Sequence, residues 1–573
     1  MGCRYSKSVQ CEEKAMGRHA ILICGLVLST TWLTTWSSVP AGATQPSPQK
    51  QVDVTDCGAV ADGVTDCLPA IQQALKQVRA TGGGVVFFPA SDKPYLVRGT
   101  IQVRGSGTVL SGTGATIKLA DGVANGTRQQ RTTESQVHVI HIAGTPREPV
   151  RKVQLLGLAI DANIYQQADY YNPRAVVTEY VSQILVQDVR IVRAFVGLDF
   201  GAGSTHCEAR DCVIEDWTED AFDASGDADK GSGAVTTHIT FLRCHARHAP
   251  NSTGNAWEIE DGVRHIRVQD CSVSDVPRGN AFGIRNHWAA GPVDVSRDIE
   301  LRRVQITAVG GKYGIYSHSA PRDQFPRNRL VDVRLYDVHC EAPVLFYGPL
   351  ERVEIDGGQF GTLHFGWDYG AKNQPQPGGP RPLEGTQVRI RNTRASHIDL
   401  NAEAGQFTFQ NVLVLARGEQ GLPQALRIRG GAGRVRIVNC TVTGARTAGV
   451  DLSQGAAPQM VDSIIWGNTV AFRVTDSQGT LSHCCIQGGV PETLEDQGGN
   501  FSADPLFISG PHGPGYLLRA GLGQAAVSPC IDAGSELAAF TGLDEWTTRR
   551  DNLPDTGAVD VGFHHRVASP RSP

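Results

Sequence analysis

The sequence predicts an all-β protein built as a right-handed parallel β-helix solenoid of about a dozen coils, with a capping helix near its N-terminus. Two observations carry this prediction: a short strand motif recurs along most of the chain, and a second aligned strand follows each copy. Composition agrees, since the chain has 65 glycines, only 3 methionines and 40% hydrophobic residues over 573 positions. Glycine-rich sequence with few aromatic residues is typical of many short strands joined by turns.

The recurring motif is a half-buried strand that ends in a turn residue. Ile266–Val273 alternates apolar and polar side chains, then bends at Asp270. Similar segments are Ile184–Ile191, Ile239–Ala246, Ile299–Ile306, Val333–Cys340, 388–393, 407–412 and Val435–Cys440. Strict alternation predicts a strand with one buried face. Starts about 20 to 35 residues apart are typical of a solenoid with insertions in its loops.

Cysteine usage follows the same repeat. Eleven of the fourteen cysteines come after Ala43. Four of them, Cys212, Cys244, Cys271 and Cys440, fall at one repeat position. This spacing favours a stack of small buried thiols over a set of disulfides.

The N-terminal 43 residues resemble an export signal. Arg18 precedes the apolar run 20–28, and Ala41-Gly42-Ala43 offers a small-x-small cleavage pattern. The run is too short to span a bilayer comfortably. We therefore expect signal peptide 1–43, linker 44–50, no membrane attachment after cleavage, and a secreted or periplasmic protein. The net charge of −5 argues against a nucleic-acid partner, which a basic face normally serves.

The first part of the expected solenoid carries a family resemblance. Val54–Asp66 leads into Ala70–Leu75 and then Gly82–Pro89, which resembles the opening of the pectate-lyase-like β-helix superfamily. That superfamily includes rhamnogalacturonases, polygalacturonases and epimerase-like proteins. The segment Asp66–Ala80 reads as an amphipathic helix with an acidic cap, suited to plugging the open end of the solenoid. Cys57 and Cys67 lie in this entry region, where they either form a disulfide or stay free.

The C-terminal region carries a second resemblance. Its segments are similar to the terminal part of large bacterial right-handed β-helix proteins, and they are 463–468, 485–489, 504–507, 528–534 and 555–564. The resemblance implies a β-helix over 51–500 and a capping segment over 501–573. It also implies that the acidic residues of this segment are structural.

The strands that follow each repeat place polar groups in columns. They are Gly197–Phe200, Ala221–Ser225, Ala256–Glu260, Ala281–His287 and Tyr313–His318. Two columns are expected to face inward, one of Phe222, Trp257, Phe282 and Tyr313, the other of Ala224, Ile259, Ile284 and Ile315. The positions between them then face outward as Asp199, Asp223, Glu258 and Gly283, and as Ser225, Glu260, Arg285 and Tyr316. His287 and His318 extend a third column.

Carboxylates on neighbouring strands about 4.8 Å apart repel one another and raise one another's pKa. Such a cluster is costly without a use, and two chemistries fit it. In one, Asp223, Glu258 and Glu260 hold Ca²⁺ and Arg285 or His287 removes a proton, so that a uronate-containing polysaccharide is cleaved by β-elimination. In the other, Asp223 and Glu258 are the acid and base of a glycoside hydrolase.

The expected partner is an acidic polysaccharide, with Asp199, Tyr316, His318 and Trp288 as substrate-binding residues. Trp217, Trp288 and Trp367 are either platforms for sugar rings or packed loop anchors. Two further interpretations remain open: a salt-bridged solvent face without a site, and a non-catalytic β-helix that binds glycans. The absence of the usual polygalacturonase motifs, and the presence of Arg285 with two histidines, favour proton abstraction by a lyase or epimerase.

Overall fold

In the computed structural model the chain divides into units 1–48 and 49–573. The described residues are 50–124, 137–168, 173–226, 234–286, 295–311, 313–319, 329–347, 350–366, 386–401, 405–416, 423–430, 434–518 and 526–567. The expected signal peptide and nearly all of the linker lie outside these ranges. Within the described residues, no helix combines the length and the apolar character needed to cross a membrane.

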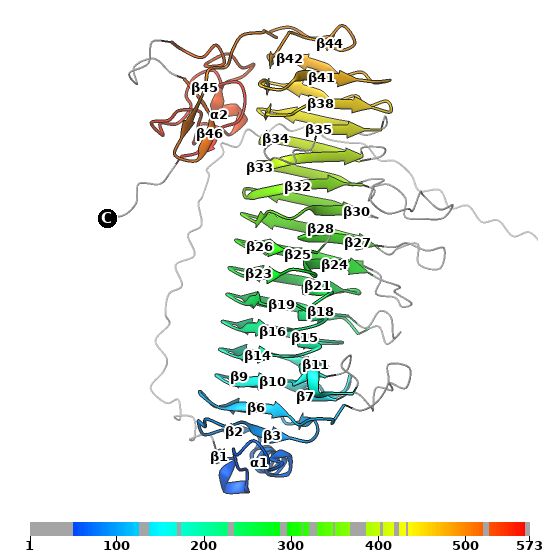
Figure 1. Cartoon of the computed structure of the whole chain (residues 1–573), viewed down its shortest axis with the longest axis vertical. Coiled ribbons are helices and arrows are strands. Elements are labelled where there is room, and N and C mark those ends of the chain that lie inside the picture. The colour runs from blue at the N-terminus through cyan, green and yellow to red at the C-terminus, as the bar shows by residue number, and fades with distance from the viewer. Residues whose placement is uncertain are drawn as a thin grey trace, which may run out of the picture. The chain divides into compact units, whose positions relative to one another are not determined.

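The fold is the predicted parallel β-helix. Forty-four strands join in one sheet through parallel pairings, and the strands stack above one another along the molecule (Figure 1). The chain visits three ladders in turn within each coil. In a parallel ladder each strand bonds to the equivalent strand one coil away, so a residue type repeated once per coil becomes a column.

Ladder 1 contains the first strand of each coil. Its strands are β1 (Gln51–Asp53), β2 (Gly84–Phe87), β5 (Thr108–Ser111), β9 (Gln154–Leu156), β13 (Leu185–Gln187), β16 (Thr205–Arg210), β19 (Thr237–Leu242), β22 (Arg264–Gln269), β25 (Val295–Arg302), β28 (Arg329–Tyr336), β31 (Arg352–Asp356), the first part of β33 (Gln387–Asn401), β34 (Gln406–Leu415), β36 (Arg434–Val438), β39 (Gln459–Val461), β42 (Thr480–Ser482) and β44 (Glu495–Asp496). The short strands β8 (Val150–Arg151) and β12 (Val181–Ser182) extend it at one edge.

Ladder 2 follows after a bend. Its separate strands are β3 (Tyr95–Val97), β6 (Thr116–Leu119), β10 (Ala159–Asp161), β14 (Arg190–Val192), β17 (Val213–Glu215), β20 (His245–Arg247), β23 (Ser272–Val276), β26 (Gln305–Val309), β29 (His339–Cys340), β37 (Thr441–Thr443), β40 (Ile464–Ile465) and β43 (Cys485–Ile486). Between β29 and β37 the ladder runs through parts of β32 (Gln359–Phe365), β33 and β34.

Ladder 3 closes each coil and carries the polar columns. Its strands are β4 (Ile101–Val103), β7 (His138–Ala143), β11 (Arg174–Glu179), β15 (Val196–Phe200), β18 (Asp220–Ser225), β21 (Asn255–Glu260), β24 (Asn280–Asn286), β27 (Ile315–Ser319), β30 (Val344–Tyr347), the ends of β32 and β33, β35 (Gln424–Arg429), β38 (Ala448–Ser453) and β41 (Val470–Val474).

The turn residue of the recurring motif is the bend between ladders 1 and 2. Residues at this position adopt positive φ values, which suits the left-handed region that Asp and Asn tolerate best. They are Asp188, Arg243, Asp270, Arg303, Asp337, Asn392, Asn411 and Asn439. The motif predicted from the sequence is therefore one strand of ladder 1, a left-handed corner and one strand of ladder 2.

Aromatic and thiol columns fill the core as predicted. The rings of Phe222 and Trp257 stack with centroids 4.6 Å apart, and those of Trp257 and Phe282 with centroids 5.1 Å apart. Cys212, Cys244 and Cys271 are buried and free, and Cys244 donates its backbone N–H to the sulfur of Cys271 at 3.3 Å. Every cysteine of the described residues is free, so of the two alternatives for Cys57 and Cys67 the structure has separate thiols.

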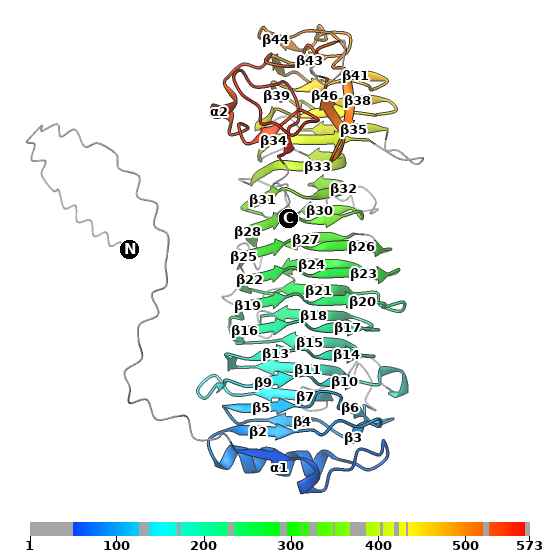
Figure 2. The same ribbon diagram turned by 90° about the vertical axis from the view of Figure 1, so that its left-hand side faces the viewer.

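The predicted helix is α1 (Leu68–Ala80), which begins two residues after the expected start. Asp66 still supplies the acidic contact, because its Oδ1 atom accepts the N–H of Leu68 at 3.0 Å. The helix packs on β1, β2, β4 and β5 and lies at one end of the stack (Figure 2). Its buried apolar face includes Ile71 and Val78. A requirement for this helix as a cap stays a prediction. Short 3₁₀ turns form at Thr55–Cys57 and Ile164–Gln166.

The parallel strands end at Asp496, and the C-terminal segment folds differently. It contains the antiparallel pair β45 (Phe507–Gly510) and β46 (Gly513–Leu517), the short helix α2 (Ala538–Thr541), and the pair β47 (Trp546–Thr547) and β48 (His565–Arg566). It lies beside the last coils, where the side-chain amide of Asn411 donates to the backbone carbonyl of His564 and accepts the backbone N–H of His564. The predicted role of residues 501–573 in closing the last coil stays a prediction.

Candidate functional site

The predicted register of the acidic column on ladder 3 is confirmed. Asp199 pairs with Asp223, and Asp223 pairs with Glu258 on the next strand. Glu260 pairs with Arg285 one coil further along. Five carboxyls and two guanidiniums gather on these strands. We call this group the acidic cluster, and its members are Asp199, Asp220, Asp223, Glu258, Glu260, Arg174 and Arg285.

The predicted register fails at β27. Ile315, rather than Tyr313, pairs with Phe282, so the strand is shifted by two residues from the sequence alignment. Tyr316 therefore lies beside Gly283, and His318 lies beside Arg285. The physical reason is that the smaller Ile315 continues the inward aromatic column, while the ring of Tyr316 takes the space left over Gly283. Aromatic type alone was a misleading guide to register here.

Glu258 is the most enclosed carboxyl of the pair on β21. It is 1% exposed, Arg285 donates to its Oε1 atom through Nε, and Asn255 donates to its Oε2 atom. Arg285 also lies 3.9 Å from Glu260. Burial and the adjacent Glu260 raise the pKa of Glu258, and the Arg285 guanidinium opposes that shift. Burial lowers the pKa of Arg285, but its ion pairs outweigh burial and raise that pKa above its usual range.

Asp199 is neutralised by a residue that the sequence did not reveal. Arg174 of β11 forms an ion pair with Asp199 Oδ2, and Ser225 donates to Asp199 Oδ1 at 3.3 Å. The position of Arg174 could have indicated this role, because Arg174 is the first residue of β11, the strand that pairs with β15. It was missed because the strand alignment started one coil later.

Asp220 and Asn255 were also missed as central members, since the segments aligned from the sequence begin one residue later, at Ala221 and Ala256, whereas β18 and β21 begin at Asp220 and Asn255. The N–H of Asn255 donates to Asp220 Oδ1 at 3.1 Å. Burial, Glu219 and Glu260 together raise the pKa of Asp220 to about 7. A shared column of Asp220, Asn255 and Asn280 at the start of three strands was the available signal.

Asp223 has the surroundings of a proton donor. It is 5% exposed, and its Oδ1 atom is buried without a hydrogen-bond partner among the described residues. Burial and the carboxylates of Asp199 and Glu260 raise its pKa well above the ordinary value. A carboxyl that keeps its proton near neutral pH is the requirement for general acid catalysis.

The same geometry bears on the predicted calcium ligands. Both oxygens of Glu258 already accept hydrogen bonds from nitrogen donors. Across the described residues, three ligand atoms come within 4.8 Å of one another only at Asp555, Asp560 and His564. Asp223, Glu258 and Glu260 thus do not converge as a Ca²⁺ cage needs, and this arrangement does not fit the ion.

The structure describes only some of the other predicted site residues. His287, Trp288 and Trp367 lie outside the described residues. The backbone of His318 pairs with Arg285, while its side chain lies outside the description. Trp217 is fully buried in the core, so it is a packed anchor and not a sugar platform.

Gly283 offers a direct test of the cluster. A Cβ atom at this position would lie 2.7 Å from Glu258 Oε2 and 3.0 Å from the hydroxyl of Tyr316. We expect Gly283→Ala to displace these side chains and reduce activity on a glycan at least about tenfold. Far-ultraviolet circular dichroism should stay unchanged, because the strand backbone at Gly283 is ordinary. Full activity in the variant would show that the Glu258 side chain is not needed in this position.

The raised pKa of Asp220 predicts a pH dependence of stability. The native carboxyl keeps its proton to about pH 7, while the unfolded carboxyl loses it near pH 4. The native state therefore binds more protons in this window, and its stability falls as pH rises from about 4 to about 7. Asp220→Asn should flatten this slope, measured as urea midpoints across the range.

Asp211 provides a matched control for that experiment. Its pKa is lowered by the hydrogen bonds from Arg243, so its contribution has the opposite sign. Asp211→Asn should cost stability above about pH 4 and little below it. Identical pH profiles for the Asp220 variant and the parent would contradict the raised pKa.

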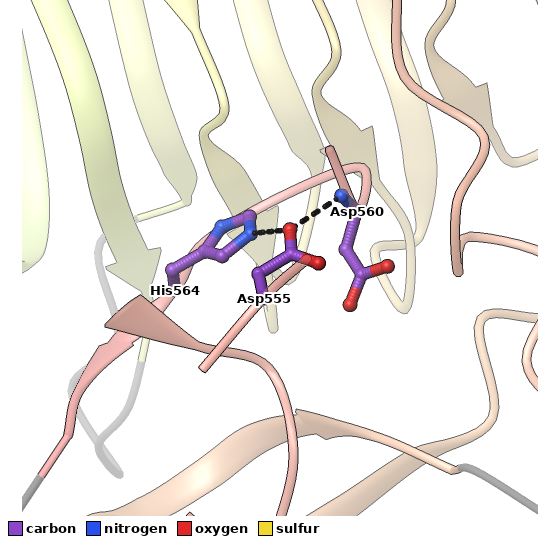
Figure 3. Close-up of side chains that lie close together, drawn as sticks. All are labelled: Asp555, Asp560 and His564. Carbon is purple, nitrogen blue, oxygen red and sulfur yellow. Dashed lines mark hydrogen bonds and ion pairs between the residues drawn. The ribbon is translucent and has the colours of Figure 1, made fainter. Parts of the chain in front are cut away.

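A second compact polar group lies in the C-terminal segment. Figure 3 shows Asp555 between His564 and Asp560, with His564 Nε2 and the N–H of Asp560 each 2.9 Å from Asp555 Oδ2. The other ring nitrogen of His564 contacts the carbonyl of Gly562, and Asp560 accepts hydrogen bonds from Thr548 and the N–H of Asp532. These bonds tie the segment together, in agreement with the expected structural role of its acidic residues.

Part of the sequence matches a known protein family. Residues 51–274 match the family model described as rhamnogalacturonase A/epimerase, pectate lyase-like. This match covers less than half of the chain, and the fold itself is a parallel β-helix. The matched part of this β-helix includes α1 and the strands that hold Asp199, Asp223, Glu258 and Glu260. No curated protein matches the sequence.

Several solved structures are similar to this β-helix at low identity. The A-module of mannuronan C-5 epimerase AlgE6 from Azotobacter vinelandii is 15% identical, covering 79% of this chain and 99% of that chain with a TM-score of 0.41. A tailspike protein of the E. coli bacteriophage HK620 in complex with a pentasaccharide is 11% identical, covering 78% of both chains with a TM-score of 0.45. The N-terminal fragment of bacteriophage Phi29 gene product 12 is 16% identical, covering 78% and 70% with a TM-score of 0.47.

Proposed function

We propose that the protein is an exported enzyme that cleaves an acidic polysaccharide at the acidic cluster, by acid–base hydrolysis of a glycosidic bond. The observation that carries this proposal is the pairing of Asp223, a carboxyl with a raised pKa and an unbonded oxygen, with Glu258, a carboxylate held by Arg285. The family match to rhamnogalacturonase A and epimerases supports a glycan substrate.

The two carboxyls would divide the work by their environments. Asp223 donates a proton to the leaving glycosidic oxygen. Burial raises the pKa of Glu258 as well, but Arg285 opposes that rise, and in its ionised form Glu258 acts as the base or stabilises positive charge on the sugar ring. The guanidinium beside Glu258, and the unbonded oxygen of Asp223, therefore assign the base to Glu258 and the acid to Asp223.

The exposure of the cluster favours an anionic substrate. Arg174 and Arg285 expose 29% and 25% of their side chains, whereas their partners Asp199 and Glu258 expose 3% and 1%. A glycan that approaches ladder 3 therefore meets the guanidiniums first. Guanidinium groups bind carboxylates with paired hydrogen bonds, which suits a uronate.

β-Elimination by a lyase remains the second candidate, because Arg285 and His318 lie side by side in register. Arg285 holds its proton tightly in this arrangement, so the base would be a histidine. The lyase prediction also included Ca²⁺, which the carboxylate geometry does not favour. A glycan-binding protein without activity is the third candidate.

Product analysis separates the three candidates. The purified protein is incubated with a panel of uronate-containing polysaccharides, with and without a chelator, and products are followed by mass, reducing ends and ultraviolet absorbance. We expect new reducing ends without an unsaturated chromophore, and no effect of the chelator. An absorbing unsaturated product would establish elimination instead, and intact glycan on every substrate would overturn the enzymatic proposal.

A further inference from the structure

A wide groove separates the C-terminal segment from the flank of the β-helix. It has a volume of about 870 Å³ and shares no residue with the acidic cluster. One wall is formed by the corner between ladders 1 and 2, including Arg302, Tyr336 and Arg394. The other wall comes from β47, β48 and neighbouring loops, including His512 and Trp546. Ligand sites commonly form where two structural units meet around a cavity of this size.

Arg394 gives this groove an uncompensated positive charge. Its guanidinium donates to the carbonyl of His512 at 2.6 Å and contacts Nδ1 of His565 at 2.8 Å, and neither acceptor is charged. It also lies 5.7 Å from the centre of the Phe563 ring. No ion pair joins it to a carboxylate in the described part of the chain. Burial accordingly lowers the pKa of Arg394, the reverse of the paired arginines in the acidic cluster.

A second polar group points to the same place. The Nε2 atom of His512, which lines the groove, is buried without a hydrogen-bond partner among the described residues. Buried polar atoms and partly buried cations normally have polar or charged partners, so the unpaired His512 Nε2 atom and Arg394 together at a cavity indicate a missing polar partner. A partner that satisfies both Arg394 and His512 would carry negative charge.

The groove also offers aromatic surface. Tyr336 and Trp546 are half-buried and lie on opposite walls. Arg302 packs over the Tyr336 ring, with its guanidinium carbon 4.4 Å from the ring centre. Aromatic faces next to polar groups are suited to the apolar faces of sugar rings. A small inorganic anion would use Arg394 but would leave these surfaces uncovered.

The carboxylates around the groove do not neutralise Arg394. Asp356 is held by Arg391 at 3.1 Å and by Asn392 at 2.8 Å. Asp544 and Glu545 are exposed at the rim, next to the exposed Arg566. Asp337 lies at the corner beside Gly357. The inner part of the groove, where Arg394 lies, is therefore positive, whereas its outer edge carries both acidic and basic side chains.

We propose that this groove is a second glycan-binding site, which takes an acidic oligosaccharide with its carboxylate on Arg394 and a sugar ring against Trp546 or Tyr336. The choice of a uronate ligand rests on the proposed function, whereas the site itself rests on Arg394, His512 and the two aromatic rings. Such a site would hold a long chain to the enzyme while the acidic cluster acts elsewhere along it, raising the local concentration of substrate.

The test measures binding without cleavage. Full-length protein carrying Asp223→Asn is titrated with galacturonate oligomers, followed by Trp546-dependent fluorescence and calorimetry. The carboxyl-reduced form of the same oligomer is the uncharged control, and a sulfated neutral oligomer separates a requirement for carboxylate from a requirement for any anion. We expect binding of the uronate oligomer, and about tenfold or greater weakening with Arg394→Gln.

Control variants keep the result interpretable. Arg394→Lys retains the charge and should recover part of the affinity, while Trp546→Ala should weaken binding without removing the anion preference. If Arg394→Gln lowers the melting temperature, the affinity of the parent is compared instead with the affinities of Arg566→Gln and Trp546→Ala, which alter two other residues that line the groove. Equal affinity for charged and reduced oligomers, or equal affinity of folded Arg394→Gln and parent, would overturn the inference.

The two proposals fail in different ways. In the otherwise native protein, Arg394→Gln should leave cleavage of short oligomers unchanged and slow cleavage of long polymers, seen as a higher KM. If the native protein cleaves no glycan but still binds uronate oligomers through Arg394, the enzymatic proposal fails and the groove stands. If it cleaves glycans while the Arg394 variants bind normally, the groove fails alone.

Discussion

Asp223→Asn is expected to lower the rate of glycan cleavage by about 10²- to 10⁴-fold, because the amide cannot donate the proton that the leaving oxygen requires. The substitution keeps the side-chain volume and removes a buried carboxyl whose pKa is raised by burial and by neighbouring carboxylates. Folding should therefore be unaffected or slightly improved. Initial rates on the best substrate of the panel, together with melting temperatures, measure both effects.

Glu208→Gln is the matched control for Asp223→Asn. Glu208 lies on ladder 1, pairs with Arg210, and is 30% exposed, so it is a carboxylate outside the acidic cluster. We expect this variant to retain full activity. If both variants lose activity equally, or if Asp223→Asn remains fully active, the acid belongs elsewhere on the protein.

Glu258 is a less clean test of the same site. It is buried in an ion pair with Arg285, and removing one partner of a buried pair leaves the other charge uncompensated. Loss of activity in a Glu258 variant would therefore mix chemistry with local destabilisation. This is a consequence of the tertiary structure, because the sequence placed Glu258 on an exposed face.

Trp257→Ala is expected to destabilise the β-helix by about 3–5 kcal/mol, the usual cost of removing a large buried aromatic side chain. Trp257 is fully buried, and its ring stacks between Phe222 and Phe282. The cavity would open directly behind Glu258 on the same strand. Unfolding in guanidinium chloride, followed by tryptophan fluorescence and circular dichroism, measures the shift in midpoint.

Two further variants are controls for the stability of Trp257→Ala. Trp257→Phe keeps a stacked ring and removes an indole N–H that has no hydrogen-bond partner among the described residues, so it should cost less than about 1.5 kcal/mol. Phe540 is 77% exposed, and Phe540→Ala should change stability by less than about 0.5 kcal/mol. A Trp257→Ala protein as stable as the Phe540 variant would contradict the assigned core column.

The carboxyls of the acidic cluster differ in pKa from a carboxyl further along ladder 3. Its five carboxyls face two guanidiniums, and burial together with the neighbouring carboxylates raises the pKa values of Asp220, Asp223 and Glu258. Further along ladder 3, Asp399 instead receives both Arg427 and Arg429, and these contacts lower its pKa despite burial. Ladder 3 thus contains one region where arginines lower the pKa of a carboxyl and another where the carboxyls have raised pKa values. Only the second region suits acid catalysis.

The sequence determined the β-helix, the aromatic column of Phe222, Trp257 and Phe282, and the register that joins Asp223 to Glu258. These features repeat once per coil, and a parallel ladder turns a repeat in sequence into neighbours in space. The tertiary structure alone decided that Arg174, Asp220 and Asn255 join the cluster, that β27 is shifted by two residues, and that Arg394 lies in a groove against the C-terminal segment. Those contacts join residues with no common repeat, so they depend on side-chain packing and on how the last segment folds back, which periodicity does not encode.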